Sequence, residues 1–327
     1  DRGIQEVLDT TAFINGPQVK QFQKEFEVYL GVKHVIPCAN GTDALQIALM
    51  ALGLTPGDEV IVPAFTYVAT AEVIALLGLK PVMVDVDYDT FNVSIQGIKD
   101  AITPQTRAIV PVHLYGQSAD MEAIMAIASE FNLHVVEDNA QAIGADYIYK
   151  NGVRAKTGTI GHIGCTSFYP SKNLGCYGDG GAIMTHDDVL GELIHKIANH
   201  GQSVRYYHDV VGCNSRLDSI QAVVLSAKLK HLDEYCRVRV LVADHYDAAF
   251  REIAELETPY RAPYSTHVFH QYTLKVKNGS RDELKKYLDD AGIPNMIYYP
   301  VPLYKQKAFE SFAGDVSYLQ NTEKLCS

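Results

Sequence analysis

Short apolar runs that alternate with helical segments constrain the fold of this chain more than any other feature of its sequence. The apolar runs predict buried strands at residues 34–39, 59–65, 80–86, 107–114 and 133–138. Helical periodicity between them predicts helices at residues 42–53, 68–78 and 120–131. Strands without polar alternation are buried on both faces, so we predict an α/β fold with a mostly parallel sheet between helices. Ligands bind such sheets beyond the carboxyl ends of the strands.

A long helix and a small α+β unit are predicted in the second half of the chain. Residues 215–253 form one long helical pattern, with a break near Tyr235 and a capping box of Ser215 and Asp218 at its start. After it we predict a strand, a helix and a second strand, at residues 269–276, 281–292 and 295–299.

The length of 327 residues suits a large domain and a smaller one, which we place at residues 1–235 and 236–327. The formal net charge of −11 argues against nucleic acid and anionic membrane surfaces as partners. No apolar run approaches the ~20 residues that cross a bilayer. The six cysteines include no CxxC pair, which argues against a metal site and a disulfide framework. We therefore expect reduced cysteines in a cytoplasmic protein.

Polar groups follow several of the predicted strands. The turn ANGTDAL, residues 39–45, opens a helix, where backbone N–H groups and the helix dipole suit a phosphate. The alternative is that Thr42 is only the N-cap of this helix. Asp138 ends an apolar strand, where a carboxylate is costly unless it meets a cation or several donors. A structural ion pair or a cap is the alternative for Asp138.

A lysine and an arginine occupy two further turns. Lys172 lies in SFYPSKNLGCYGDGGA, residues 167–182, between a predicted strand and a glycine-rich turn. An exposed surface lysine is the simplest interpretation, but the apolar and small neighbours suit a partly desolvated amine with a lowered pKa, able to act as a nucleophile. Arg216 lies in GCNSRLD, residues 212–218, at the head of the long helix. The helix dipole does not favour a cation there, so an anion partner explains Arg216 better than a position on the first helical turn without a ligand.

A lysine nucleophile, an aspartate at a strand end and a phosphate site at a helix terminus together fit pyridoxal phosphate. This cofactor needs a Schiff-base lysine, a carboxylate at its pyridinium nitrogen and an anchor for its phosphate. The order along the chain also fits, because the phosphate turn precedes Asp138 and Asp138 precedes Lys172.

Several motifs along nearly the whole chain resemble the sugar aminotransferases of the DegT/DnrJ/EryC1/StrS family. They are FINGPQV, NGTDAL, GDEVIVPAFTYVATAEVI, VHLYGQSADM, EDNAQAIGA, SFYPSKNLGCYGDGGAI, NSRLDSIQA and YYPVPL. The resemblance implies the aspartate-aminotransferase-like fold (fold type I), with a three-layer αβα large domain that binds pyridoxal phosphate and a small α+β domain. Relatives continue beyond the point where this chain stops, so we expect the small domain to be truncated.

The same resemblance implies a role for each residue of the cofactor site. Lys172 would form the Schiff base and move the proton between substrate and cofactor, and Asp138 would pair with the pyridine nitrogen. Gln141 would contact the ring hydroxyl, with Ala140 beside one ring face and Tyr67 stacked on the other. The phosphate would be bound by Gly41, Thr42 and Ser167.

The resemblance also implies a homodimer with shared active sites. Asn214 would come from the second subunit to complete the phosphate anchor. Arg216, also from the second subunit, would hold the carboxylate of the amino donor, L-glutamate. The keto sugar would be bound by Arg216, Tyr298, Tyr299 and His200. Tyr298 stands where many relatives have a histidine, so the sugar specificity depends on a residue that departs from the family pattern.

For the reaction, the sequence looks most like the enzymes that aminate C3 of a UDP-linked 2-acetamido-3-keto-hexuronic acid. We therefore expect a transaminase that uses L-glutamate and a nucleotide-linked keto sugar in the biosynthesis of a surface polysaccharide, such as the O-antigen of lipopolysaccharide. The motif EDNAQAIGA is also similar to enzymes that act on dTDP-3-keto-6-deoxyhexoses. That activity is one alternative, and a non-catalytic family member that binds pyridoxal phosphate is another.

Overall fold

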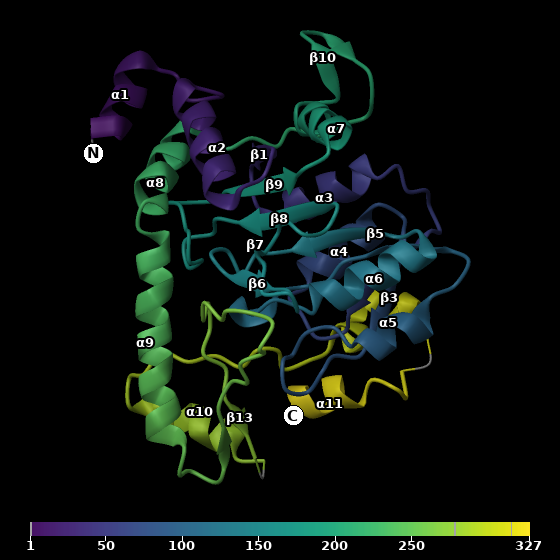
Figure 1. Ribbon diagram of the computed structural model, residues 1–327, viewed down its shortest axis with the longest axis vertical. Coiled ribbons are helices and arrows are strands. Elements are labelled where there is room, and N and C mark those ends of the chain that lie inside the picture. The colour runs from purple at the N-terminus through teal and green to yellow at the C-terminus, as the bar shows by residue number, and fades with distance from the viewer. Residues whose placement is uncertain (1, 278, 315) are drawn as a thin grey trace.

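A seven-stranded sheet forms the centre of the computed structural model, which describes residues 2–277, 279–314 and 316–327 (Figure 1). The strand order is β1-β9-β8-β5-β4-β2-β3. The strands are β1 (His34–Cys38), β2 (Glu59–Pro63), β3 (Lys80–Val84), β4 (Thr106–Ile109), β5 (His134–Asp138), β8 (Ile163–Ser167) and β9 (Gly181–Thr185). Strands β8, β5, β4, β2 and β3 pair in parallel, whereas β9 is antiparallel to β8 and β1. The predicted mostly parallel sheet is confirmed.

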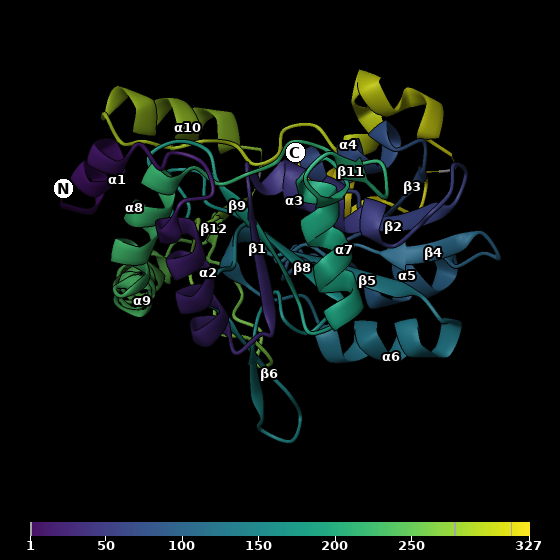
Figure 2. The ribbon, with the colours of Figure 1, turned by 90° about the horizontal axis from the view of Figure 1, so that it is seen from above.

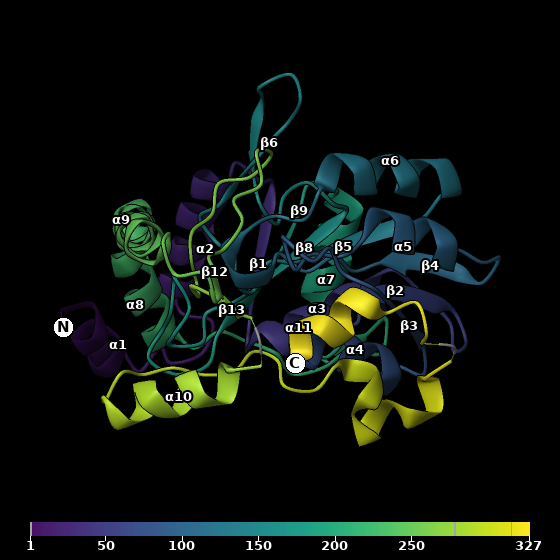
Figure 3. The ribbon, with the colours of Figure 1, turned by 90° about the horizontal axis from the view of Figure 1, so that it is seen from below.

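Helices cover both faces of this sheet, as Figures 2 and 3 show from opposite sides. On one face lie α3 (Gly41–Ala51), α4 (Ala69–Leu76) and α7 (Asp188–Ala198), and on the other α5 (Ile95–Ala101) and α6 (Met121–Phe131). Val60 and Val62 of β2 pack on the face with α3 and α4, while Ile61 between them packs on the face with α5 and α6. Because both faces are buried, the strands are rich in apolar residues without a polar alternation.

The long helical stretch consists of two helices that stand along one side of the molecule (Figure 1). They are α8 (Ser219–Leu229) and α9 (Leu232–Phe250). Helix α8 packs against α2 (Pro17–Leu30). The helix is interrupted at Lys230 and His231, between α8 and α9. The predicted break near Tyr235 is therefore misplaced by about one helical turn.

The predicted capping box at the start of this stretch is also wrong. Ser215 lies outside α8, and the cap position Asp218 makes no side-chain hydrogen bond to the helix. The Ser215 hydroxyl instead donates to Asp43 Oδ2 at 2.6 Å and accepts from the Ala39 N–H at 3.0 Å. A hydroxyl occupied by these two partners is not available to cap a helix.

The strand predicted at residues 269–276 is reduced to β13 (Lys275–Val276), which pairs with β12 (Leu256–Glu257). The preceding residues bond to a loop instead of a strand. The Gln271 N–H, for example, donates to the Tyr115 carbonyl at 3.3 Å. An apolar pattern alone does not distinguish these two kinds of partner.

Helix α10 (Arg281–Asp290) forms as predicted, but residues 295–299 form no strand. The Tyr298 carbonyl accepts from the side chain of Tyr115 at 2.8 Å, not from a neighbouring strand. A side-chain donor thus bonds this carbonyl, and the Tyr299 hydroxyl reaches the site described below.

The division of the chain into residues 1–235 and 236–327 stays a prediction. Residue 235 lies inside α9. The last helices pack back against the large sheet: η2 (Leu303–Lys305), η3 (Lys307–Phe312) and α11 (Gln320–Cys326). Helix α11 is tied to the end of β3, because the Thr322 hydroxyl donates to Asp85 Oδ1 at 2.7 Å.

The remaining elements lie outside the central sheet. They are α1 (Arg2–Thr10), η1 (Leu114–Gly116) and the hairpins β6 (Asp146–Ile148)–β7 (Arg154–Lys156) and β10 (Gln202–Val204)–β11 (Tyr207–His208). All six cysteines are unpaired. In the part of the chain that the structure describes, none of the helices has the length and apolar character that a bilayer crossing requires. The same residues contain no group of three or more His, Cys, Asp or Glu side chains placed to hold a metal ion.

Candidate active site

The predicted phosphate turn lies at the N-terminus of α3. Asn40 caps this helix, because its side-chain oxygen accepts from the Asp43 N–H at 2.8 Å. The alternative that Thr42 is only the N-cap is therefore wrong. The N–H groups of Gly41 and Thr42 belong to the open end of the helix, where the positive end of the dipole favours an anion.

Ser167 closes this turn from the end of β8. A Cβ on Gly41 would lie 2.7 Å from the Cβ of Ser167, closer than real Cβ contacts. Gly181 approaches the same turn, where its Cβ would collide with the Asn40 carbonyl oxygen. The structure thus brings Gly41, Thr42 and Ser167 together, and the missing side chain of Gly41 leaves a cradle between helix and strand.

Asp138 ends β5 on the face of the sheet that α4 covers. Its Oδ2 accepts from the Thr70 hydroxyl at 2.8 Å and its Oδ1 accepts from the Ala140 N–H at 3.1 Å. Burial raises the pKa of Asp138, while these hydrogen bonds and the charge of Lys172 oppose the rise. The carboxylate is therefore held by dipoles, and a cation placed beside it would be strongly favoured.

Lys172 lies in the turn after β8, where its N–H donates to the Tyr169 carbonyl at 2.8 Å. The side chain is half-buried, and its Nζ makes no hydrogen bond or ion pair with the other described residues. Burial lowers the pKa of Lys172, and the charge of Asp138 opposes this shift. An amine that is poorly solvated and lies near a carboxylate suits a nucleophile better than an exposed surface lysine does.

Tyr298 and Tyr299 reach this site from the far end of the chain. The Tyr299 hydroxyl accepts from Gln141 Nε2 at 3.3 Å. Burial raises the pKa of Tyr299, and the charge of Asp138 contributes to the rise. Tyr67 itself is 58% exposed, as a side chain that stacks on a ligand would be. Tertiary structure thus brings three predicted residues together, Gln141, Tyr298 and Tyr299.

Asn214, Arg216 and His200 do not contact Lys172 or Asp138 through a hydrogen bond or an ion pair among the described residues. His200 is exposed at the base of the β10–β11 hairpin, which projects from the molecule (Figure 1). Asn214 and Arg216 flank Ser215, whose hydroxyl bonds Asp43 of α3.

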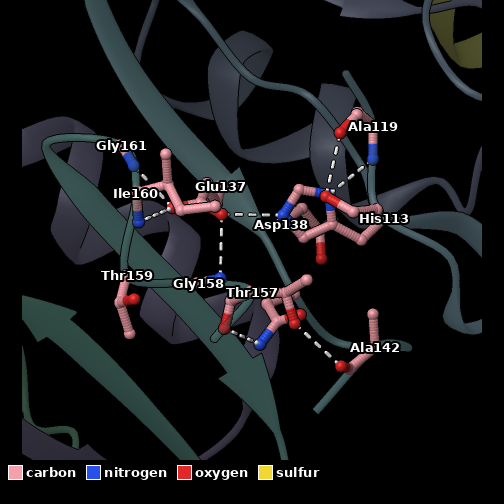
Figure 4. Close-up of polar contacts among 12 residues, drawn as sticks. His113, Ala119, Glu137, Asp138, Ala142, Thr157, Gly158, Thr159, Ile160 and Gly161 are labelled. Carbon is pink, nitrogen blue, oxygen red and sulfur yellow. Dashed lines mark hydrogen bonds and ion pairs between the residues drawn. The ribbon is translucent and has the colours of Figure 1, made fainter. Parts of the chain in front are cut away.

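A buried carboxylate anchors the end of β5 from the opposite face of the sheet (Figure 4). Glu137 accepts hydrogen bonds of 2.6–2.8 Å from the N–H groups of Gly158, Ile160 and Gly161. His113 Nε2 lies 2.8 Å from Glu137, and both side chains are fully buried. Because His113 Nδ1 accepts from the Ala119 N–H at 3.1 Å, its Nε2 carries the proton and donates to Glu137. This network holds the strand end that carries Asp138.

The sequence profile of the DegT/DnrJ/EryC1/StrS aminotransferase family matches residues 1–327. The chain belongs to this family. The resemblance described above is therefore confirmed, together with the fold type and the prediction of a transaminase. Pyridoxal phosphate as the cofactor is confirmed as well.

Three relatives of this aminotransferase show how far the similarity extends. UDP-2-acetamido-2-deoxy-3-oxo-D-glucuronate aminotransferase of Pseudomonas aeruginosa is 50% identical over 308 residues, which cover 94% of this chain and 84% of the relative. UDP-N-acetyl-3-dehydro-alpha-D-glucosamine 3-aminotransferase of Acidithiobacillus ferrooxidans is 48% identical over 307 residues, 94% of this chain and 81% of the relative. The crystal structure of NtdA from Bacillus subtilis with bound cofactor PMP is 35% identical, with a TM-score of 0.90, over 99% of this chain and 74% of that chain.

The residues of this aminotransferase fit pyridoxal phosphate. The open N-terminus of α3 and the cradle at Gly41 suit its phosphate. The poorly solvated amine of Lys172 suits its aldehyde, and the buried carboxylate of Asp138 suits its pyridinium nitrogen. A positive charge on that nitrogen would offset the burial of Asp138, which no lysine or arginine pairs directly among the described residues.

The sequence did not identify four residues whose hydrogen bonds hold the groups of the aminotransferase site: Thr70, His113, Tyr115 and Glu137. Glu137 could have been recognised from the sequence. Glu137 and Asp138 are consecutive on a strand that is buried on both faces, so each needs its own set of donors. Tyr115 had no such signal, because its role depends on Gln141 and Tyr298, which lie far away in the sequence.

Proposed function

We propose that this aminotransferase moves the amino group of L-glutamate to C3 of a UDP-linked 2-acetamido-3-keto-hexuronic acid. The observation that carries the proposal is the half-buried amine of Lys172 beside the buried carboxylate of Asp138. The names of two relatives support a UDP sugar with an oxo group at C3, and the glucuronate in the name of the first supports the hexuronic acid. The 3-amino product would serve the biosynthesis of a surface polysaccharide such as an O-antigen.

The proposed chemistry rests on Lys172, Asp138 and Gln141. Pyridoxal phosphate, when bound, supplies an electron sink for the charge that develops at the reacting carbon. Lys172 Nζ would hold the cofactor and then move the proton at that carbon, which its lowered pKa supports. Asp138 would accept a hydrogen bond from the protonated pyridine nitrogen. Gln141 would donate to the ring hydroxyl oxygen from its Nε2.

The remaining contacts of the cofactor would come from α3 and from the rim of the site. Ala140 and Tyr67 would lie on the two faces of the ring, which the exposure of Tyr67 supports. Tyr298 and Tyr299 would face the sugar. The phosphate would be bound by Gly41, Thr42 and Ser167.

The proposal includes a homodimer in which each subunit completes the site of the other. Asn214 would bind the phosphate across the interface, Arg216 would bind the donor carboxylate, and His200 would line the sugar side. The exposed aromatic side chains of the β10–β11 hairpin support a partner at this place, since Tyr206 and Tyr207 are 76% and 70% exposed. The unpaired cysteines favour the cytoplasm as the location.

The visible absorption spectrum of the protein with pyridoxal phosphate tests this function. We expect a band of the bound cofactor that L-glutamate abolishes and that the correct keto sugar then restores. Lys172→Ala should lack the band and its response to glutamate. Restoration by a dTDP-3-keto-6-deoxyhexose and not by the UDP-linked hexuronate would favour the alternative substrate. A band that no amino donor changes would indicate a non-catalytic member of the family.

A further inference from the structure

Tyr115 lies behind the candidate site with a backbone conformation that bulky residues rarely adopt. Its φ is 57° and its ψ is 1°, in the left-handed region, and the residue is only 2% exposed. Such a conformation persists where the surrounding structure holds it, and it is often found at functional sites. The N–H, the carbonyl and the hydroxyl of Tyr115 each bond a different segment, at Gln141, Gln271 and Tyr298.

The backbone of Tyr115 fixes the orientation of the Gln141 amide. The Tyr115 N–H lies 2.7 Å from one terminal atom of this amide. A backbone N–H can only donate, so the facing atom is the oxygen Oε1, and the NH2 group must point the other way. Gln141 therefore presents donors to the site, and one of them lies 3.3 Å from the Tyr299 hydroxyl.

This orientation determines which hydrogen bonds the Tyr299 hydroxyl can make. Because the Tyr299 oxygen accepts from Gln141, the proton of its own hydroxyl is not used in that bond. Among the described residues, no other hydrogen-bond partner of this hydroxyl is found. Burial raises the pKa of Tyr299, so the hydroxyl keeps its proton at neutral pH. The edge of the Tyr299 ring packs on Phe65, with the ring centroids 5.6 Å apart, which restricts the ring.

The side chain of Tyr115 holds the same segment from a second point. Its hydroxyl donates to the Tyr298 carbonyl at 2.8 Å, and its ring packs edge-on against Phe91, with centroids 5.2 Å apart. The Tyr115 carbonyl accepts from the Gln271 N–H at 3.3 Å. One residue thus ties residues 298–299 to the strand end that carries Asp138.

We infer that Tyr115 is a positioning residue that aligns Gln141 and residues 298–299, so that Tyr299 presents its O–H to an acceptor oxygen of the nucleotide-linked sugar. A keto, hydroxyl or carboxylate oxygen of the sugar meets this requirement, whereas a sugar N–H does not. The inference rests on the proposed function for the identity of the ligand.

Tyr115→Phe tests the inference, because it removes only the hydroxyl and keeps the N–H that orients Gln141. The Tyr298 carbonyl then loses its donor, and residues 298–299 lose one anchor. We expect the KM for the keto sugar to rise about tenfold, the usual effect of leaving one carbonyl without its hydrogen-bond donor. The rate of the glutamate half-reaction should fall by a smaller factor. Tyr147→Phe is the matched control, since it removes another buried hydroxyl, bonded to Asp120 at 2.8 Å.

A double-variant cycle distinguishes positioning from general support. Calorimetry on the holoenzyme measures the Kd of UDP-2-acetamido-2-deoxyglucuronic acid, the 3-hydroxy analogue of the proposed substrate. Tyr299→Phe should weaken this binding about tenfold. If Tyr115 acts through Tyr299, adding Tyr115→Phe to Tyr299→Phe weakens it little further. Additive effects, or an unchanged Kd and KM in Tyr115→Phe, would overturn the inference.

Two further outcomes are informative. If Tyr115→Phe and Tyr147→Phe impair both half-reactions and the melting temperature equally, Tyr115 is only a structural residue and the inference fails. If glutamate leaves the cofactor band of the natural protein unchanged, the proposed function fails instead. In that case the Kd cycle with the UDP sugar still decides the role of Tyr115.

Discussion

Thr70 donates a hydrogen bond of 2.8 Å from its hydroxyl to Oδ2 of Asp138, and both residues are buried. Thr70 belongs to α4 and Asp138 ends β5, so the bond joins a helix to the sheet at the candidate cofactor site. A donor at this distance stabilises the ionised carboxylate against the cost of its burial. The bond therefore maintains the charge that the pyridinium nitrogen needs.

Thr70→Val removes this donor and preserves the shape of the side chain. The pKa of Asp138 should rise further, and the affinity for pyridoxal phosphate should fall by about tenfold, the usual effect of one hydrogen bond to a charged group. Titration of the cofactor absorption band measures the Kd. Thr322→Val is the matched control, because Thr322 is also buried and donates to a carboxylate, that of Asp85. Equal cofactor affinity in the two variants would contradict the prediction.

In the cofactor-free protein, the pH dependence of the free energy of unfolding should reflect the titration of Asp138. Burial raises its folded-state pKa above the ordinary 3.8, so the folded state binds more protons than the unfolded state between the two values. Stability is therefore lost as the pH rises through that window, and the loss is complete above it. Asp138→Asn carries no such charge, and its amide can bond both Thr70 and the Ala140 N–H. Urea unfolding at a series of pH values should show that the free energy of unfolding of Asp138→Asn increases relative to that of the natural protein as the pH rises. A difference that is independent of pH would refute this.

Gly41→Ala should weaken binding of the phosphate group. The new Cβ would lie 2.7 Å from the Cβ of Ser167, so the helix start must shift away from β8. We expect the Kd of pyridoxal phosphate to rise at least about tenfold, because backbone N–H groups bind phosphate only in the correct geometry. Gly314→Ala is the control, since nothing lies within 4 Å of a Cβ there. An unchanged Kd in Gly41→Ala would place the phosphate elsewhere.

Glu137→Ala should destabilise the protein severely although Glu137 does not face the cofactor. Its removal leaves the N–H groups of Gly158, Ile160 and Gly161 and the ring N–H of His113 without an acceptor (Figure 4). We expect the free energy of unfolding to fall by about 3–5 kcal/mol. Glu130→Ala, on the exposed face of α6, should change it by less than about 0.5 kcal/mol. Urea unfolding of both variants measures this difference. Similar midpoints would disprove that the hydrogen bonds of Glu137 stabilise the fold.

The sequence alone indicated the parallel strands of the central sheet and the cofactor chemistry, but not the antiparallel strand β9. Strands buried on both faces are mostly apolar on both, so their short apolar runs could be recognised without a structure. Asp138 stood out because a carboxylate at the end of such a run is costly unless it meets a cation or several donors, and Lys172 because its neighbours are apolar or small. The motif resemblance then implied Gly41, Thr42 and Ser167, and the structure brings these three together.

Only the tertiary structure decided the partners of these groups. Thr70, His113 and Tyr115 act through hydrogen bonds to residues 24–183 positions away in the chain, and such pairs leave no periodic signal. The strand predicted at residues 269–276 was shortened to β13, and that at residues 295–299 did not form, for the same reason. Periodicity reports which side chains are buried, whereas the partner of each backbone carbonyl or N–H depends on which loop the fold places against it.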